Sequence, residues 1–151
     1  MEKLTIIKLG GEVLVDSTSF KFVMKEIASL TGKRVVVHGG GKIADEVAEK
    51  LGVESQFIGG RRITSTPMRD VTIMVYGGLL NGRIVAELQG NSCNAAGLNG
   101  ADGRLLCANK RISEIDFGYV GDISEVNTEI LLQHFERNTV PVVAPLTFSN
   151  S

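Results

Sequence analysis

The sequence predicts an α/β fold, a three-layer sandwich with helices on both faces of a mostly parallel sheet. First, the nearly continuous apolar segment Leu4–Leu9 is typical of a strand buried on both faces of a parallel sheet. Second, apolar residues recur at helical spacing over residues 20–30, after the N-cap chemistry of Asp16 and Ser17. Third, residues 34–51 repeat this order of strand and helix, which favours right-handed crossover connections.

Both of these predicted strands end in glycines. The strand over residues 34–37 leads through His38 into Gly39–Gly41, and Leu4–Leu9 leads into Gly10 and Gly11, with Lys8 close before them. Glycines let backbone N–H groups approach a ligand closely, and the helix that follows adds a positive dipole end. An isolated glycine triplet could equally be a tight turn that only serves packing. A second strand that ends in glycines, at Gly10 and Gly11, favours an anion-binding site.

The helix after the glycine triplet is expected to bury Ile43, Val47 and Leu51 and to present Asp45 to solvent. Further along, a hairpin is predicted within residues 53–64, and a helix from Pro67 is expected to kink or pack closely at Gly77 and Gly78. Additional strands and one helix complete the pattern, at 94–98, 105–108 and 140–145, with an N-cap at Asn127. The edge near residues 140–144 is expected to be unsatisfied and prone to association.

Composition excludes several function classes. The chain of 151 residues has one domain's length, 43% apolar residues, 22% charged residues and a net charge of -1, with no tryptophan, so nucleic-acid binding is not expected. Cys93 and Cys107 match neither a zinc site nor a redox pair and are interpreted as small buried side chains. No metal-ligand cluster is found, and His38 is interpreted as structural. Without a leader or a long apolar run, a cytoplasmic protein with no membrane contact is predicted.

The order of motifs resembles the amino-acid kinase family, and within it the N-terminal part of the N-acetylglutamate kinases. The first two glycine motifs are also similar to those of carbamate, aspartate and uridylate kinases, so they indicate the superfamily only. The Arg-Ile-Thr hairpin and the Asn-Ala-Ala-Gly-Leu segment point to the acetylglutamate branch. The resemblance covers essentially the whole chain and is carried by Lys8–Gly11, Val37–Lys42, Gly60–Thr64, Asn94–Gly103, Gly118–Ile123 and Val140–Pro145.

The resemblance implies that residues 1–151 form an acyl-glutamate-binding N-terminal lobe, and that the nucleotide-binding lobe of the family is absent from this sequence. It also implies ATP with Mg²⁺ as the phosphoryl donor, an acyl-glutamate as the small-molecule partner, and a homodimer. Mg²⁺ would arrive with the ATP phosphates rather than on protein ligands.

Phosphorylation of a carboxylate requires no general base, because the carboxylate is already ionised at neutral pH. It requires relief of repulsion between two anions and stabilisation of the transferring phosphoryl group. Lys8 is therefore the catalytic candidate, and Gly10 and Gly11 are the candidates for binding phosphate. The alternative is that Lys8 is a solvated lysine at a strand end, which is disfavoured because an unpaired lysine in a buried strand is costly.

The candidates for binding the acyl-glutamate are Gly40 and Gly41, through their N–H groups, and Arg62, through a bidentate fork on the α-carboxylate. The alternative for Arg62 is an exposed hairpin arginine, and Arg61 is expected to be only that.

The resemblance implies that the chain is an acyl-glutamate kinase (N-acetyl-L-glutamate 5-phosphotransferase) of arginine biosynthesis. Two alternatives remain open: a truncated module that binds acyl-glutamate without phosphotransfer, and a kinase for N-succinylglutamate. A different kinase of the superfamily is disfavoured by the Arg62 hairpin.

Overall fold

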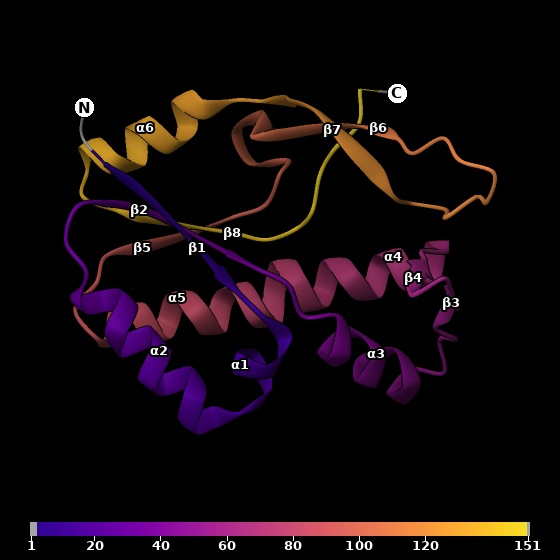
Figure 1. Ribbon diagram of the computed structural model, residues 1–151, viewed down its shortest axis with the longest axis horizontal. Helices are drawn as coiled ribbons and strands as arrows, with labels where there is room; N and C mark the ends of the chain where they lie inside the picture. The colour runs from indigo at the N-terminus through magenta and orange to yellow at the C-terminus, as the bar shows by residue number, and fades with distance from the viewer. Residues whose placement is uncertain (1–2, 151) are drawn as a thin grey trace.

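A computed structural model describes residues 3–150. Its centre is a four-stranded parallel sheet in the order β1 (Leu4–Leu9), β2 (Lys33–His38), β8 (Val140–Val143) and β5 (Ala95–Leu98) (Figure 1). Because all four strands run in the same direction, their carboxyl ends lie together on one side of the molecule. The predicted α/β class with a parallel sheet is confirmed.

Helices cover both faces of this sheet, as predicted. One face carries α1 (Gly11–Val15), α2 (Ser17–Ser29), α3 (Gly41–Lys50) and a long helical run over residues 66–90, and the other face carries α6 (Thr128–Glu136) (Figure 1). The larger core lies on the first face and includes Met24, Val36, Ile84 and Val142. A smaller core beneath α6 includes Val35, Leu98, Leu105 and Val143.

The long helical run consists of α4 (Thr66–Thr72), a π-helix η1 (Ile73–Leu80) and α5 (Asn81–Gly90). The π-helix spans the predicted interruption, and close packing is found there, because a Cβ on Gly77 would lie 2.8 Å from Asn99 Oδ1. Among the described residues, this run is the one helix long and apolar enough to cross a membrane. Six of its apolar side chains nevertheless lie inside the core: Met68, Val71, Val75, Leu80, Ile84 and Leu88.

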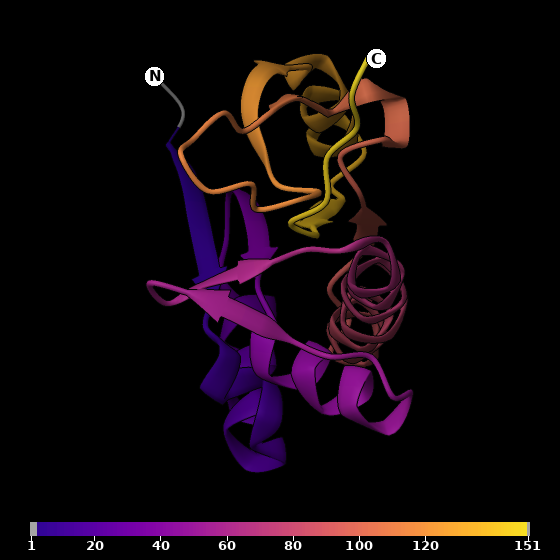
Figure 2. The same ribbon diagram turned by 90° about the vertical axis from the view of Figure 1, so that its right-hand side faces the viewer.

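Two antiparallel pairs project from the sheet (Figure 2). The predicted hairpin is confirmed: β3 (Gln56–Ile58) pairs with β4 (Arg61–Ile63) through Gly59 and Gly60, whose φ angles of 56° and 76° fit a two-residue type I′ turn. The second pair joins β6 (Leu106–Lys110) to β7 (Gly121–Val126), next to the short 3₁₀ turn η2 (Asp102–Arg104). The α6 N-cap is Asn127, as predicted, and its side chain accepts from Glu129 N at 3.3 Å.

The prediction that β1 is buried on both faces is wrong. This strand is an edge of the sheet, and Leu4 and Ile6 are 45% and 68% exposed. In the described part of the chain, the core beneath α6 includes residues of β2, β5 and β8 but none of β1. The apolar run therefore reflects one covered face and one open face.

The prediction of an unsatisfied edge near residues 140–144 is also wrong, because β8 lies between β2 and β5. Val140 N donates to Asn94 O at 2.8 Å, and Ala144 N donates to Leu98 O at 2.9 Å. Pro141 fits this central strand because β2 pairs with β8 only from Val142 onward, so its missing N–H removes no ladder bond.

The buried face of α3 differs from the predicted one. Ala44 and Ala48 are fully buried, whereas Leu51 is 57% exposed and Asp45 is half-buried. Alanines on the inner face let α3 pack closely against α1, α4 and η1. Asp45 is therefore turned towards the β3–β4 hairpin rather than towards solvent.

We expect Gly97→Ala to destabilise the fold by about 1–3 kcal/mol, the range typical of overpacked cores. A Cβ on Gly97 would lie 1.9 Å from Asn81 Oδ1, and the Asn81 amide also donates to Val142 O at 3.0 Å. The measurement is the urea unfolding midpoint at constant m-value. The matched control is Gly82→Ala, where no atom lies within 4 Å of the new Cβ and the helix should gain up to about 1 kcal/mol. Equal unfolding midpoints for the two variants would contradict the packing argument.

Candidate functional site

The two glycine turns lie side by side at the carboxyl ends of β1 and β2. The strands pair in parallel with Leu9 opposite His38, and Gly39 N donates to Leu9 O at 3.3 Å. In open parallel sheets, ligands commonly bind at this edge. The structure therefore brings Gly10 and Gly11 next to the triplet that begins α3.

Glycine is required at position 40. Gly40 is the N-cap of α3 with φ at 143°, and a Cβ there would lie 2.1 Å from Leu80 Cδ1 and 3.4 Å from Tyr76 Cε1. The turn thus rests directly on the π-helix. At Gly41 a Cβ would lie 3.5 Å from Arg62 Nη2, so the hairpin arginine lies against the turn.

Arg62 joins three elements at this turn. Its Nη2 donates to Gly41 O at 3.0 Å and to Asp45 Oδ2 at 2.7 Å, and its Nη1 donates to Tyr76 Oη at 3.2 Å. The guanidinium carbon also lies 5.3 Å from the ring centroid of Phe57, a cation–π distance. Arg62 is therefore fixed in place rather than being a mobile hairpin side chain.

The charge of Arg62 is compensated by Asp45. The two side chains are 14% and 34% exposed, and Ser55 Oγ holds the other carboxylate oxygen of Asp45 at 2.7 Å. Burial alone lowers the pKa of Arg62, but the bonds to Asp45 and Tyr76 outweigh it, so the net shift is upward. The Nε atom of Arg62 is buried without a hydrogen-bond partner. A donor is thus available for a further acceptor.

His38 is hydrogen-bonded at both ring nitrogens. Nδ1 lies 2.9 Å from Gly39 O, and Nε2 lies 3.2 Å from Asn81 Nδ2, which also bonds Val142 O. Because the amide is a donor, Nε2 accepts and Nδ1 carries the proton. Burial lowers the pKa of His38, although the bond to Gly39 O opposes this shift. The ring is thus a neutral link beneath the glycine turn, which agrees with a structural role.

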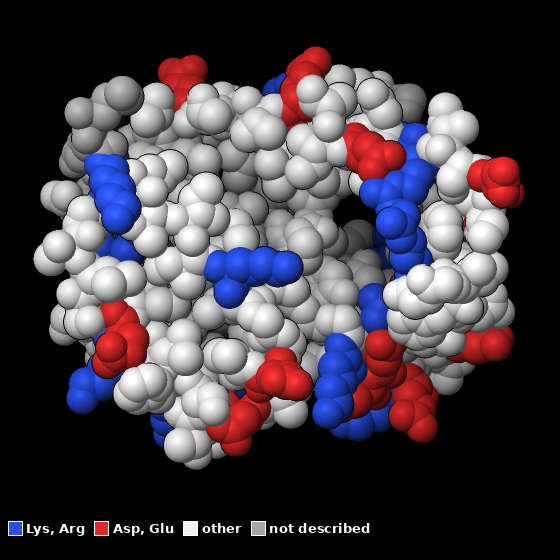
Figure 3. Space-filling view, viewed as in Figure 1, with Lys and Arg blue, Asp and Glu red and all other residues white. Residues whose placement is uncertain are grey.

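A cleft adjoins the turn, between the β6–β7 pair and the long helical run, and Figure 3 shows a deep hollow on this face. Two cavities of about 310 and 710 Å³ share Tyr119, Val120, Gly121 and Thr147 in their walls. Tyr76 lines the smaller one and accepts the hydrogen bond from Arg62. Arg62 thus adjoins the cleft through Tyr76.

The predicted site residues are brought together only in part. Gly40, Gly41 and Arg62 are in contact. Lys8 lies at the same end of the sheet, opposite Val37, but its side chain is exposed, and within residues 3–150 no hydrogen bond or ion pair joins it to Arg62. The argument that burial makes an unpaired Lys8 costly therefore does not hold.

Sequence reasoning missed Asp45, Tyr76 and Phe57 as neighbours of Arg62. A signal exists for Asp45, which follows Gly41 by four residues, so that both lie on the same face of α3 one turn apart. Tyr76 and Phe57 carry no local signal, because their contacts with Arg62 depend on how the hairpin packs on the helical run.

Metal ligation has no support among the described residues. Within 3–150, no group of three or more His, Cys, Asp or Glu side chains could hold an ion. Cys93 and Cys107 are buried free thiols, as predicted.

The sequence matches the model of the amino acid kinase family over residues 3–151. It is 45% identical over 149 residues to an acetylglutamate kinase from Cytophaga hutchinsonii, an alignment that covers 97% of this chain and 56% of that enzyme. The chain thus spans a little more than half the length of the curated relatives it matches.

Solved structures share the fold. The protein smu.665 from Streptococcus mutans UA159 superposes with a TM-score of 0.85 at 24% identity, covering 99% of this chain and 61% of that one. An N-acetylglutamate synthase from Neisseria gonorrhoeae, complexed with coenzyme A and N-acetyl-glutamate, gives 0.76 at 22% identity and covers 97% and 34%. At these identities the likeness concerns the fold alone.

We expect the protein to lose stability as the pH falls below 6.5, because of His38. Its pKa in the folded state lies below the ordinary value of 6.5, so the unfolded chain takes up a proton that the folded chain excludes. This contribution is complete above pH 6.5, and below that value it is lost with a slope of at most about 1.4 kcal/mol per pH unit.

Denaturant titrations between pH 7.5 and about 5 measure this slope, since ordinary carboxylates titrate below that range. His38→Gln should flatten the slope. An unchanged slope in the His38 variant would refute the assignment.

Proposed function

This chain belongs to the amino acid kinase family, and on that premise we propose that it forms the acyl-glutamate-binding lobe of an acyl-glutamate kinase. The reaction would transfer a phosphoryl group from ATP to the side-chain carboxylate. The observation that carries the proposal is the guanidinium of Arg62, fixed over the glycine turn with Nη2 3.0 Å from Gly41 O. The 45% identity to an acetylglutamate kinase supports it.

Arg62 would bind the α-carboxylate of the acyl-glutamate. Asp45, Gly41 and Tyr76 use three of its N–H donors, which leaves one on Nη1 and the buried one on Nε. A guanidinium held in one orientation loses little entropy when it binds a second acceptor.

The phosphoryl group would lie by the first glycine turn. No atom lies within 4 Å of a Cβ built on Gly10 or Gly11, so the backbone there is open to a bulky anion. Lys8, exposed two residues earlier, would supply positive charge against the developing negative charge of the phosphoryl oxygens. ATP would bring Mg²⁺ on its phosphates, and these three residues would face that group.

A second candidate function is a module that binds acyl-glutamate without phosphotransfer. It requires only the cluster of Gly40, Gly41 and Arg62, and within residues 3–150 no hydrogen bond or ion pair joins Lys8 to this cluster. The acyl group is proposed to be acetyl, with succinyl as the alternative. A homodimer, a cytoplasmic location and a place in arginine biosynthesis belong to the same proposal.

Calorimetry and an ADP-release assay on this chain separate the candidates. Saturable heat with N-acetyl-L-glutamate together with ADP formation supports the kinase, and heat without ADP supports the binding module. N-succinyl-L-glutamate is titrated in parallel to assign the acyl group. Absence of saturable heat with both ligands would overturn both functions.

We expect Arg62→Lys to weaken binding of N-acetyl-L-glutamate by about 10- to 100-fold, because a lysine keeps the charge but cannot form the planar fork. The control is Arg61→Lys on the exposed neighbouring position, which should change the affinity less than about twofold. Thermal unfolding of each variant checks that the hairpin remains folded.

A ligand in which an amide replaces the α-carboxylate of N-acetylglutamate tests which of the two carboxylates Arg62 binds. If Arg62 binds the α-carboxylate, wild type and Arg62→Lys should bind this amide equally weakly, because the interaction is already lost. If Arg62→Lys lowers the affinity for the amide as much as the affinity for N-acetyl-L-glutamate, Arg62 does not bind the α-carboxylate and has another place in the site.

A further inference from the structure

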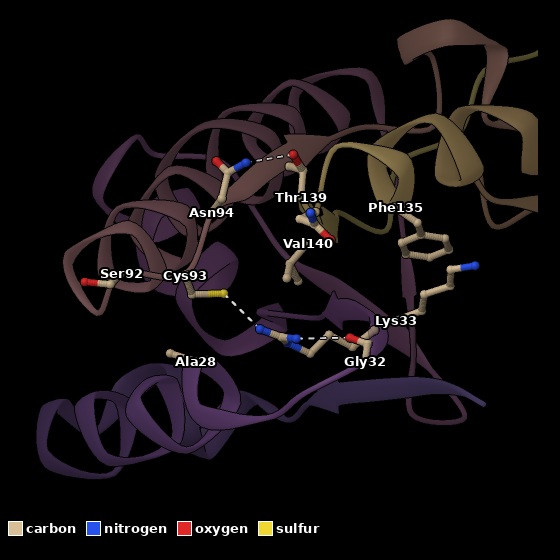
Figure 4. A pocket seen from close by; sticks show the side chains of 11 residues that line it. Ala28, Gly32, Lys33, Ser92, Cys93, Asn94, Phe135, Thr139 and Val140 are labelled. Carbon is tan, nitrogen blue, oxygen red and sulfur yellow. Dashed lines mark hydrogen bonds between the residues drawn. The ribbon is translucent and has the colours of Figure 1, made fainter. Parts of the chain in front are cut away.

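A second polar cavity lies at the opposite end of the sheet, where β2 and β8 begin. Its volume is about 470 Å³ (Figure 4). Segments from α2, β2, the start of β8 and the loop before β5 converge on it, so residues far apart in the sequence line one hollow. The residues that matter are Arg34 and Cys93, with Ala28, Phe135, Asn94 and Thr139 around them.

The guanidinium of Arg34 is the main charge in this cavity. Nη1 donates to Gly32 O at 3.1 Å, and Nη2 donates to Cys93 Sγ at 3.3 Å; both bonds are drawn in Figure 4. A thiol is a weak acceptor. The Nε atom is buried without any partner, and within residues 3–150 no carboxylate forms an ion pair with Arg34.

The comparison with Arg62 shows what Arg34 lacks. Arg62 is compensated by a carboxylate at 2.7 Å, whereas the acceptors of Arg34 are one backbone carbonyl and one sulfur. A partly buried charge without a counter-ion is unfavourable, and an unpaired buried donor adds its own desolvation cost. An anion in the cavity would relieve both.

We propose that this cavity binds a small organic oxyanion, a carboxylate or a phosphate ester, through Arg34. The anionic group would accept from the N–H groups that Gly32 O and Cys93 Sγ leave free on Nη1 and Nη2 and, after a small shift of the side chain, from the buried Nε–H, since a guanidinium binds carboxylate and phosphate alike.

The remaining wall indicates the shape of the ligand. Ala28, Phe135 and Val140 provide an apolar side, and the side chains of Asn94 and Thr139, bonded to each other at 2.8 Å, provide a polar one. Figure 4 shows Phe135 and Val140 on the wall that belongs to α6 and β8. A volume of about 470 Å³ exceeds that of a bare ion, so an apolar body beside the oxyanion is expected.

This site is independent of the glycine turns. Arg34 is at the start of β2 and Gly40 follows its end, and six residues of extended chain separate them by roughly 20 Å. Failure of the acyl-glutamate proposal therefore leaves this inference standing, and the reverse also holds.

Four probes test the proposal by titration of the whole chain: acetate and inorganic phosphate, and benzoate and phenyl phosphate as their counterparts with an apolar body. The readout is the ¹H–¹⁵N resonance of Arg34 Nε, assigned by its loss in Arg34→Lys. We expect saturable shifts of this resonance, with benzoate or phenyl phosphate binding about tenfold tighter than its bare counterpart. Tighter binding of acetate and benzoate would indicate a carboxylate ligand, and tighter binding of inorganic phosphate and phenyl phosphate would indicate a phosphate ester.

Two variants and one control complete the test, with calorimetry as readout. Arg34→Lys keeps the charge but removes the Nε–H and should weaken binding by at least about tenfold. Ala28→Leu fills the cavity without touching Arg34 and should weaken binding of the probes with an apolar body. Arg137→Lys changes an exposed arginine outside the cavity and should alter binding less than about twofold.

Absence of saturable binding by all four probes up to about 10 mM, a range that includes millimolar affinities, would overturn the proposal. So would equal affinities in wild type and Arg34→Lys. Thermal unfolding of the variants establishes that they are folded at the titration temperature.

Discussion

The ion pair between Arg62 and Asp45 is the interaction on which the geometry of the candidate site depends. It joins the β3–β4 hairpin to α3, and the further bonds to Gly41 O and Tyr76 Oη extend the connection to the glycine turn and the helical run. The pair is only partly buried, so its net contribution to stability is modest. Its contribution to position is larger, because a planar fork bonded at three acceptors has one orientation. A hairpin with little buried surface of its own is thereby held over the turn.

The parallel direction of the strands explains why the two candidate anion-binding sites, the glycine turns and the Arg34 cavity, lie apart. In a parallel sheet all strands begin at one edge and end at the other. The glycine turns follow the strand ends, where helix N-termini supply N–H groups, whereas Arg34 belongs to the edge where the strands begin. At that edge the chain arrives from helix C-termini, whose carbonyls do not attract anions. Such carbonyls favour a cation, and Gly32 O accepts a hydrogen bond from Arg34 there, but within the described residues no carboxylate forms an ion pair with Arg34.

The positions of these strands along the chain and the α6 cap could be predicted from the sequence because they rest on local signals. Leu4–Leu9, the hairpin at Gly59 and Gly60, and the Asn127 cap all lie where the pattern indicates. Errors arose where a property depends on distant partners. The open face of β1 and the central place of β8 depend on which strands pair, and the half-burial of Asp45 depends on the hairpin. The assignment of binding roles came from a family resemblance rather than from periodicity, which carries no information on contacts between elements.

The π-helix η1 accounts for the part of the site that the pattern could not foresee. A π-turn adds a residue to each turn of helix and so rotates the following side chains relative to an α-helix. Within η1, Tyr76 reaches Arg62, and Leu80 closes on Gly40 so tightly that no side chain fits there. Gly77 meanwhile leaves room for Asn99 and Leu146 on the cleft side. Tyr76 and Leu80 are four residues apart and face the glycine turn together, whereas Gly77 faces the cleft side. The two glycines that suggested a break therefore lie in a helix that is wound more loosely but stays continuous from Thr66 to Gly90, and this helix rests on the turn of the candidate site through Tyr76 and Leu80.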